Sequence, residues 1–176
     1  HVLPLVTIPQ GRIGYVFARD GVPLNPSQTL ASNDKANDFQ DAAIFLRANG
    51  QRGPQRKILR EGTYAIHLSQ FVVIAEERVY ALALDKTEEE LFRRMARLIA
   101  EREGFTAVVI KGHEDMLGIV TVHDGPSLPM GQIIAPTVGE DASQTATYHN
   151  SFQDPEKFLA AGGLRGRQLQ VLVEGT

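Results

Sequence analysis

The fold is decided by a stretch near the start of the chain, Ile13-Gly14-Tyr15-Val16-Phe17-Ala18-Arg19-Asp20-Gly21-Val22-Pro23-Leu24. The same pattern returns 104 residues later as Leu117-Gly118-Ile119-Val120-Thr121-Val122-His123-Asp124-Gly125-Pro126-Ser127-Leu128. The match continues through Gln28 with Gln132 and Ala31 with Ala135. Self-similarity over such a spacing is the sequence mark of a duplicated structural unit. The chain is therefore predicted to contain two related units.

A second matched block follows at a spacing of 113 residues. Its members in the first copy are Phe39-Gln40-Asp41, Phe45-Leu46, Gly50, Arg52, Gly53, Gln55, Leu59 and Glu61-Gly62-Thr63, and those in the second are Phe152-Gln153-Asp154, Phe158-Leu159, Gly163, Arg165, Gly166, Gln168, Leu172 and Glu174-Gly175-Thr176. The change of spacing means that the second copy carries nine extra residues. They fall in the polar stretch 137–150, which is predicted to be a longer surface loop.

Each unit is predicted to combine short strands with one short helix. Residues 2–8, 12–19 and 71–74 are rich in β-branched and aromatic side chains, which favour strands. Residues 56–60 and 168–173 are predicted to be strands that lead into the Glu-Gly-Thr turn. Asp154 suits a helix N-cap and Pro155 the first helical position, so Asp41 is predicted to cap the matching helix. Gly50 and Gly163 are predicted to end these helices.

A strand–helix–strand insert is predicted between the units, with strands at residues 78–84 and 105–110. Thr87 and Glu90 have the spacing of a capping box at the helix start, and Gly104 is expected to end the helix. Its apolar stripe is predicted to consist of Leu91, Phe92, Met95, Leu98 and Ile99. The predicted fold is therefore α+β and β-rich, with a first repeat unit at residues 1–75, the insert at 76–112 and a second unit at 113–176.

Composition excludes several classes of function. The 176 residues carry a net charge of −3, so no basic field exists to hold nucleic acid. There is no cysteine, which excludes disulfides, thiolate metal sites and a cysteine nucleophile. No apolar run approaches the roughly 20 residues that span a bilayer. No phosphate-binding glycine loop or nucleophile elbow is present, and no cofactor is expected.

The second copy is predicted to be incomplete. The first copy continues past Thr63 into the apolar strand at 71–74, whereas the second stops at Thr176. An open sheet edge and exposed apolar surface should result, which would make the second copy the less stable one. The opening His1-Val2-Leu3-Pro4 likewise suggests a fragment of a longer protein.

The histidines are the first candidates for a chemical site. His113-Glu114-Asp115 contains possible metal ligands, but a solvated turn produces the same string without a site. His123-Asp124 could be an acid–base pair, yet its counterpart is Arg19-Asp20, so the shared element is the Asp-Gly turn. His67 and His149 are predicted to be surface residues. A structural interpretation of all four is favoured, and no catalytic or metal-binding residue is predicted.

Two repeated turns are the candidate binding sites. They consist of Arg52, Gly53 and Gln55 in the first copy and of Arg165, Gly166 and Gln168 in the second. Exposed N–H groups beside an arginine can hold an anion such as a phosphate or a lipid headgroup. The alternative is a tight turn that serves only the fold, which the repetition favours because a duplicated fold element repeats itself.

Taken in order, these motifs resemble the band 7 (SPFH, flotillin- and stomatin-like) family, and in particular bacterial flotillin-like members with N-terminal β-rich repeats. The resemblance covers most of residues 6–74 and 116–176, with Glu61 at a position where the family often has proline. It is carried by Pro9-Gln10-Gly11-Arg12-Ile13-Gly14-Tyr15-Val16, Ala18-Arg19-Asp20-Gly21, Gly50-Gln51-Arg52-Gly53-Pro54-Gln55 and Ile58-Leu59-Arg60-Glu61-Gly62-Thr63-Tyr64.

The resemblance implies a non-catalytic scaffold or interaction fragment of a membrane-associated protein that organises membrane microdomains or assembles into oligomers. It also implies self-association or partner membrane proteins, with membrane contact through segments outside this chain. One alternative is a small-ligand, anion-binding or hydrolytic domain that uses the Arg-Gly-x-Gln turns or the region of His113. Another is a regulatory domain that packs against a partner subunit in a ring.

Overall fold

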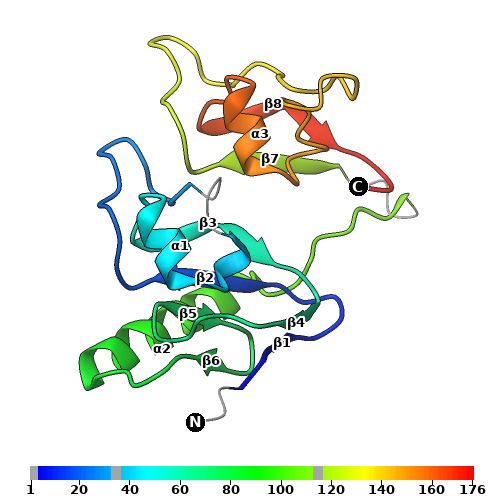
Figure 1. Ribbon diagram of the computed structural model, residues 1–176. Helices are drawn as coiled ribbons and strands as arrows, with labels where there is room; N and C mark the ends of the chain where they lie inside the picture. The colour runs from blue at the N-terminus through cyan, green and yellow to red at the C-terminus, as the bar shows by residue number, and fades with distance from the viewer. Residues whose placement is uncertain (1–3, 33–36, 113–116) are drawn as a thin grey trace. The chain divides into compact units, whose positions relative to one another are not determined.

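The computed structural model describes residues 4–32, 37–112 and 117–176. The chain divides into two compact units. The first comprises His1–Leu24 and Leu30–Ala107, and the second comprises Asn25–Thr29 and Val108–Thr176. Both contain antiparallel strands and short helices, so the predicted α+β, β-rich fold is confirmed (Figure 1). In the part of the chain described, no helix is both long and apolar enough to cross a bilayer.

The first unit is built on a four-stranded antiparallel sheet in the order β3-β2-β5-β6. Beside it, β1 and β4 form a two-stranded antiparallel ladder in which Val6 faces Tyr64 and Ile8 faces Gly62. The strands are β1 (Val6–Ile8), β2 (Gly14–Ala18), β3 (Gly53–Leu59), β4 (Gly62–Tyr64), β5 (Phe71–Ile74) and β6 (Val79–Tyr80).

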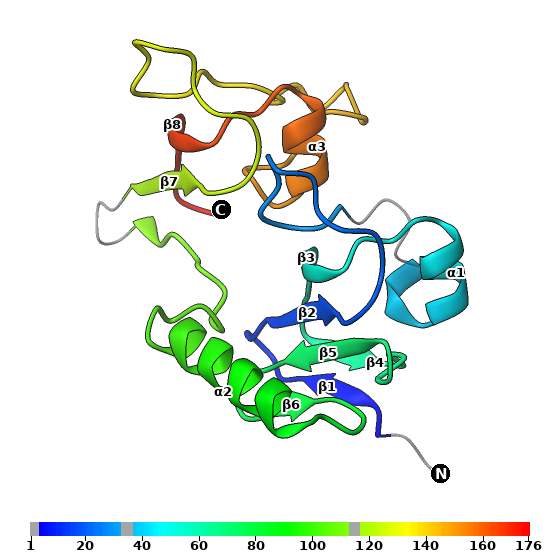
Figure 2. The same ribbon diagram turned by 90° about the vertical axis from the view of Figure 1, so that its left-hand side faces the viewer.

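Both faces of this sheet are covered. Successive side chains of a strand point to opposite faces. In β5, Phe71 and Val73 therefore join one core cluster and Val72 and Ile74 join another, so all four are buried. Helix α1 (Ala42–Arg47) lies on one side of the sheet and α2 (Lys86–Ala100) on the other (Figure 2).

The start of α2 differs from the prediction. Asp85, and not Thr87, is the N-cap, and its carboxylate accepts a hydrogen bond from the backbone N–H of Glu88. The Glu88 side chain accepts from the Asp85 backbone N–H, which completes a capping box two residues before the predicted one. Both pairs have the spacing of a capping box. The Asp85 pair is the one that forms, and it places Glu88 beside Arg19, the residue that follows β2.

The contact face of α2 also differs in part from the predicted stripe. Phe92 is buried, and Met95, Ala96 and Ile99 pack beside it against the sheet. Leu91 and Leu98 were predicted on the same stripe but are exposed. The sheet contacts a narrow band of positions i, i+3, i+4 and i+7, and leucines on the flank of that band remain outside it.

The predicted insert does not form a separate part. Strand β6 and helix α2 complete the sheet of the first unit, which extends to Ala107. Residues 105–110, predicted to be a strand, form no strand. Instead, Ile110 begins the second copy, since its backbone exchanges hydrogen bonds with Gly175 and Thr176. This matches the contact of Ile8 with Gly62 in the first copy, so the second unit begins before residue 113.

The second unit repeats the core of the first. Strand β7 (Gly118–Val122) pairs with β8 (Gly166–Leu172), and Gly118 faces Leu172 as Gly14 faces Leu59. In both hairpins the register shifts once, at the same repeat position. The prediction of two similar units is thereby supported residue by residue.

The short helices repeat as well. Asp41 caps α1, and Asp154 caps α3 (Pro155–Ala160), as predicted. Phe39, in the 3-10 turn η1 (Asn37–Phe39), and its counterpart Phe152 both have positive φ. A Cβ added at Gly50 or Gly163 would meet the ring of the preceding Phe45 or Phe158 at 2.5 Å or less. These two glycines are therefore required for the close approach of the ring. The left-handed residue that follows each helix is Asn49 or Gly162, one position before the glycine predicted to end it.

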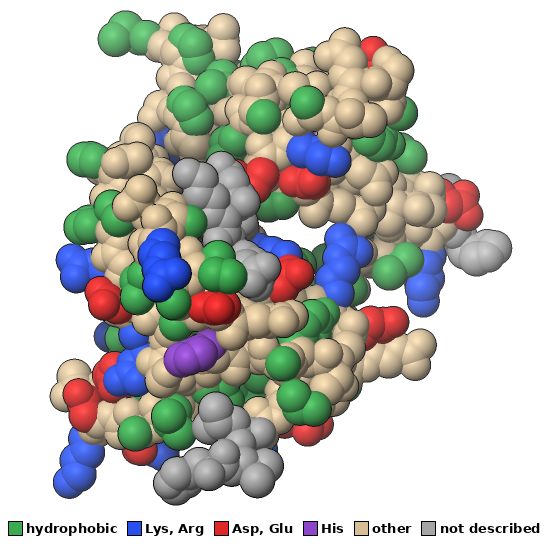
Figure 3. Space-filling model, viewed as in Figure 1, with side chains coloured by type: hydrophobic (Ala, Val, Ile, Leu, Met, Phe, Trp, Pro, Cys, Tyr) green, Lys and Arg blue, Asp and Glu red, His purple; other side chains and the backbone are tan. Residues whose placement is uncertain are grey.

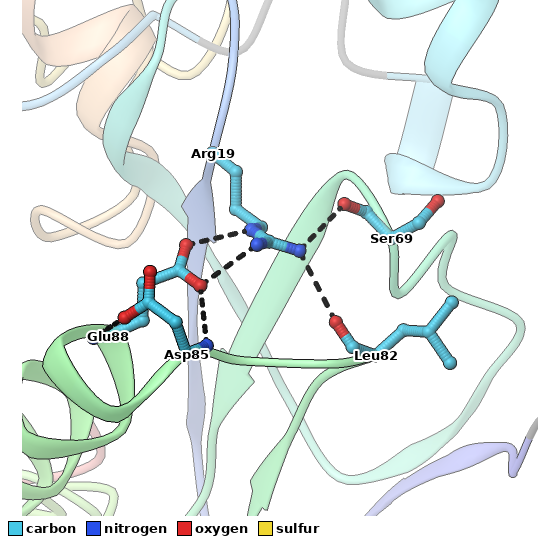
Figure 4. Close-up of polar contacts among 5 residues, drawn as sticks. All are labelled: Arg19, Ser69, Leu82, Asp85 and Glu88. Carbon is cyan, nitrogen blue, oxygen red and sulfur yellow. Dashed lines mark hydrogen bonds and ion pairs between the residues drawn. The ribbon is translucent and has the colours of Figure 1, made fainter.

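The Arg19 side chain links the start of α2 to the backbone at Ser69 and Leu82 (Figure 4). Its guanidinium donates to both carboxylate oxygens of Glu88, at 3.1 and 2.9 Å, and to the carbonyls of Ser69 and Leu82, each at 3.3 Å. The side chains of Arg19 and Glu88 are only 27% and 29% exposed, so solvent screens this pair less than a surface pair. The contact fixes the start of α2 against β2.

Replacing Arg19 with alanine should lower the free energy of unfolding by about 1–3 kcal/mol, because charge-assisted, partly buried hydrogen bonds are lost. The matched control is Arg93→Ala. Arg93 forms an exposed i, i+4 pair with Glu89, and its loss should cost less than about 0.5 kcal/mol. Urea unfolding followed by circular dichroism measures both. Equal losses in the two variants would contradict the role of Arg19.

Candidate interaction surface

One face of the antiparallel strand pair β7–β8 is apolar and exposed. It presents side chains that alternate along both strands and their extensions, each 40–70% exposed, namely Leu117, Ile119, Leu169, Val171 and Val173. Ile119 faces Val171 across the ladder, so these side chains form one surface. We call it the hairpin face. Adjacent exposed apolar side chains of this kind mark interaction sites more often than isolated ones do.

The same face of the first repeat is covered, and its side chains Tyr15 and Phe17 are partly buried. Phe17 meets Phe92 of α2 edge-to-face, with ring centroids 5.1 Å apart, and Tyr15 meets Phe105 at 5.9 Å. Tyr15 also donates its hydroxyl to the carbonyl of Gly104, and burial raises the pKa of this tyrosine. The counterparts of Tyr15 and Phe17 in the second repeat are Ile119 and Thr121, and both are exposed.

The edge of the hairpin is open as well. In the first repeat β2 lies between β3 and β5, so both of its edges are paired. In the second repeat β7 pairs with β8, and no described strand lies along its other edge. Unpaired backbone groups at a strand edge are a template for another strand.

The opposite face of the hairpin is closed by a histidine. His149 was predicted to be a surface residue, but it is 1% exposed. Its ring lies 4.8 Å from that of Phe152 and 5.4 Å from that of Phe158. In the first repeat, Phe71 of β5 has this position against Phe39 and Phe45. Among the described residues, the second repeat has no strand equivalent to β5, and the extra residues supply His149 in its place.

Hydrogen bonds hold the His149 ring in position. Its Nδ1 accepts from the backbone N–H of Phe152 at 2.9 Å, and its Nε2 lies 2.7 Å from the carbonyl of Val138. Both contacts are satisfied by the neutral ring with its proton on Nε2. Earlier in the same loop, Asp141 accepts from Ser143, and this side-chain hydrogen bond lowers the pKa of the Asp141 carboxyl. The extra loop is therefore ordered around its own turn.

The glutamines of the two candidate anion-binding turns serve the fold. Gln55 donates from Nε2 to the carbonyls of Gln51 and Gly53, and Gln168 donates likewise to Leu164 and Gly166. Both glutamine side chains are buried. Their geometry supports the tight-turn alternative for these residues.

The arginines of the same turns face outward. Arg52 and Arg165 are exposed, but their backbone N–H groups donate to the carbonyls of Val22 and Pro126. These N–H groups are therefore already used within the fold. Arg165 borders an open groove of about 430 Å³, which is lined by Thr121, Val122, His123, Leu128, Arg165 and Gly166.

The other sequence candidates are not brought together. Asp124 is 7% exposed, and its Oδ1 accepts from the backbone N–H and the hydroxyl of Thr29, each at 3.0 Å. The Asp-Gly turn thus uses this carboxylate as a structural acceptor. His67 is exposed as predicted. His113-Glu114-Asp115 lies outside the described residues, and elsewhere no three His, Cys, Asp or Glu side chains gather into a possible metal site.

A scan against protein-family models and searches of curated proteins and solved structures find no match to this chain. The surface must therefore be interpreted from its own geometry. The nearly continuous apolar runs at 117–122 and 169–173 could have identified the hairpin face, because a strand needs apolar side chains on only one side to pack on a core.

Replacing His149 with alanine should destabilise the second unit by about 2–4 kcal/mol, because it leaves a cavity between Phe152 and Phe158. His149→Phe retains a ring but leaves the Phe152 N–H and the Val138 carbonyl unpaired, which should cost about 1–3 kcal/mol. The control is His67→Ala, with a change within about 0.5 kcal/mol.

Hydrogen exchange of the β8 amides reports on this unit specifically. They should exchange faster in both His149 variants, while the β3 amides stay unchanged. If His149→Ala exchanges like His67→Ala, the ring does not have the role of Phe71.

Proposed function

We propose that this chain is a non-catalytic interaction module of a scaffold, in which the second repeat binds a strand along the open edge of β7 and a helix on the hairpin face. The supporting observation is the hairpin face together with the open edge of β7. The first repeat provides the template, since β5 and α2 cover the equivalent edge and face there. The partner should therefore offer an apolar strand followed by an amphipathic helix.

The energetic argument favours association. Covering an exposed Val, Leu or Ile side chain stabilises by up to about 1.5–3 kcal/mol. Five such side chains lie on the hairpin face. Entropy lost on association offsets part of this gain. Added strand hydrogen bonds along β7 would give direction to an otherwise non-specific apolar contact.

The resemblance to the band 7 family agrees with this function. Members of that family assemble into oligomers at membranes, and the family has no accepted catalytic residues. On this proposal, the chain belongs to a flotillin-like scaffold, with membrane contact through segments outside it.

A peptide with the sequence of residues 69–80, which contains β5 and β6, is a direct probe. An excess of this peptide should slow hydrogen exchange of the Gly118–Val122 amides, because it adds a strand to the open edge. Ile119→Lys should weaken binding at least about tenfold, because a desolvated charge would then face the added strand. Gln144→Lys, which adds the same charge on the exposed extra loop, should bind as the unmodified chain does.

Fluorescence anisotropy of the labelled peptide gives the affinities. The proposal is wrong if β7 gains no protection and the two lysine variants bind equally.

A second candidate function is anion binding in the groove beside Arg165. His123 and Arg165 both line this groove, and no carboxylate does. The ligand would be a phosphate group, either free or on a lipid.

Inorganic phosphate should then shift the His123 ring resonances in a saturable manner. Arg165→Gln should abolish the shift, whereas the counterpart change Arg52→Gln should not. Vesicles with anionic headgroups distinguish a lipid from free phosphate. A shift that survives Arg165→Gln would exclude this candidate.

A further inference from the structure

The segment Asn25–Thr29 belongs to the second unit, although it lies in the loop that follows β2. Within this unit, Thr29 donates twice to Asp124 of the Asp-Gly turn, and Asp124 is buried. The loop that follows β2 thus binds the Asp-Gly turn that follows β7 through these hydrogen bonds. Each repeat has both a loop and a turn of this kind.

Among the described residues, the equivalent loop of the second repeat binds no Asp-Gly turn. Residues 129–133 correspond to 25–29, and Ile133 corresponds to Thr29. The local turn is the same, because Gln132 donates to the Pro129 carbonyl as Gln28 donates to that of Asn25. Met130 is fully exposed and Ile133 is 84% exposed. Figure 3 shows hydrophobic side chains at the tip of the loop that follows β7, at the upper left.

The Asp-Gly turn of the first repeat is exposed and binds no such loop among the described residues. Asp20 is exposed, unlike its counterpart Asp124. Its carboxylate accepts from the backbone N–H of Gly21 within its own turn. The described part of the chain therefore has one loop, 129–133, that binds no Asp-Gly turn, and one exposed Asp-Gly turn at Asp20. By their repeat positions, this loop and this turn correspond to the pair that do bind each other, Asn25–Thr29 and Asp124.

We infer that residues 129–133 of one copy dock on the Asp20-Gly21 turn of a second copy of this chain. The Ile133 backbone N–H would donate to the Asp20 carboxylate, as the Thr29 N–H does to Asp124. Ile133 lacks the hydroxyl that supplies the second hydrogen bond, and the apolar contact of Met130 and Ile133 takes its place. Because loop and turn are different surfaces, the contact is head-to-tail and continues from copy to copy.

The inference does not require the hairpin face, so the two proposals can fail separately. Sedimentation equilibrium should show a weight-average mass that rises beyond that of a dimer with increasing concentration. Asp20→Ala should leave the chain monomeric over the same range. Ile119→Lys on the hairpin face should leave this association unchanged, whereas a loss in Ile119→Lys with none in Asp20→Ala would assign self-association to the hairpin face instead.

Ile133→Thr is the decisive variant because it restores the second donor. It should strengthen association about fivefold or more, since a hydrogen bond to a charged group outweighs the apolar area removed. Ile134→Thr removes similar apolar area without placing a hydroxyl at the Thr29 position, and it should not strengthen association. The gain should vanish when Ile133→Thr is combined with Asp20→Ala.

Two outcomes overturn the inference. A chain that stays monomeric at every concentration excludes the contact. If association weakens equally in Ile133→Thr and Ile134→Thr, the contact is non-specific and apolar, and the loop does not bind the Asp20 turn. Circular dichroism of each variant confirms that the fold is retained.

Discussion

An aromatic ring must fill the space between the helix and the hairpin of each repeat, and the rest of the structure depends on how that ring is supplied. In the first repeat Phe71 lies against Phe39 and Phe45, and it brings β5 with it into the sheet. In the second repeat His149 has this place and comes from a loop. A buried ring of either type contacts many neighbours, so its removal would open a cavity in a core that is small in each unit.

The source of the ring decides what remains exposed. A ring on a strand covers one face and pairs an edge at the same time, and the following β6 and α2 then cover the other face. A ring on a loop fills the core but pairs nothing. The second repeat therefore keeps a stable inner face while its outer face and one edge stay available. Among the described residues, the second repeat thus combines a packed inner face with an exposed apolar outer face.

Much of the fold could be predicted from sequence because the duplication aligns each residue with a second example. Asp154-Pro155 marks the helix start that Asp41 alone leaves ambiguous, and the matched glycines fix the turns. Contacts between distant segments could not be predicted. His149 lies in a polar stretch without a counterpart, and nothing local indicates its burial. The capping of α2 involved two overlapping motifs, and the one that forms places Glu88 beside Arg19, which lies 69 residues away in the sequence.

The difference between Asp20 and Asp124 follows from the same limit of local sequence. Both occupy the same turn, yet one is exposed and the other buried, because Thr29 donates to Asp124 from 95 residues away. When the loop of one repeat binds the Asp-Gly turn of another, each repeat needs a neighbour to form all of these contacts. Each added member buries one carboxylate and leaves one loop exposed, so the exposed loop is a constant feature of any finite series. On the inferred head-to-tail contact, such a geometry favours extension over closure, because the loop and the turn are different surfaces and each added copy leaves both available at the ends.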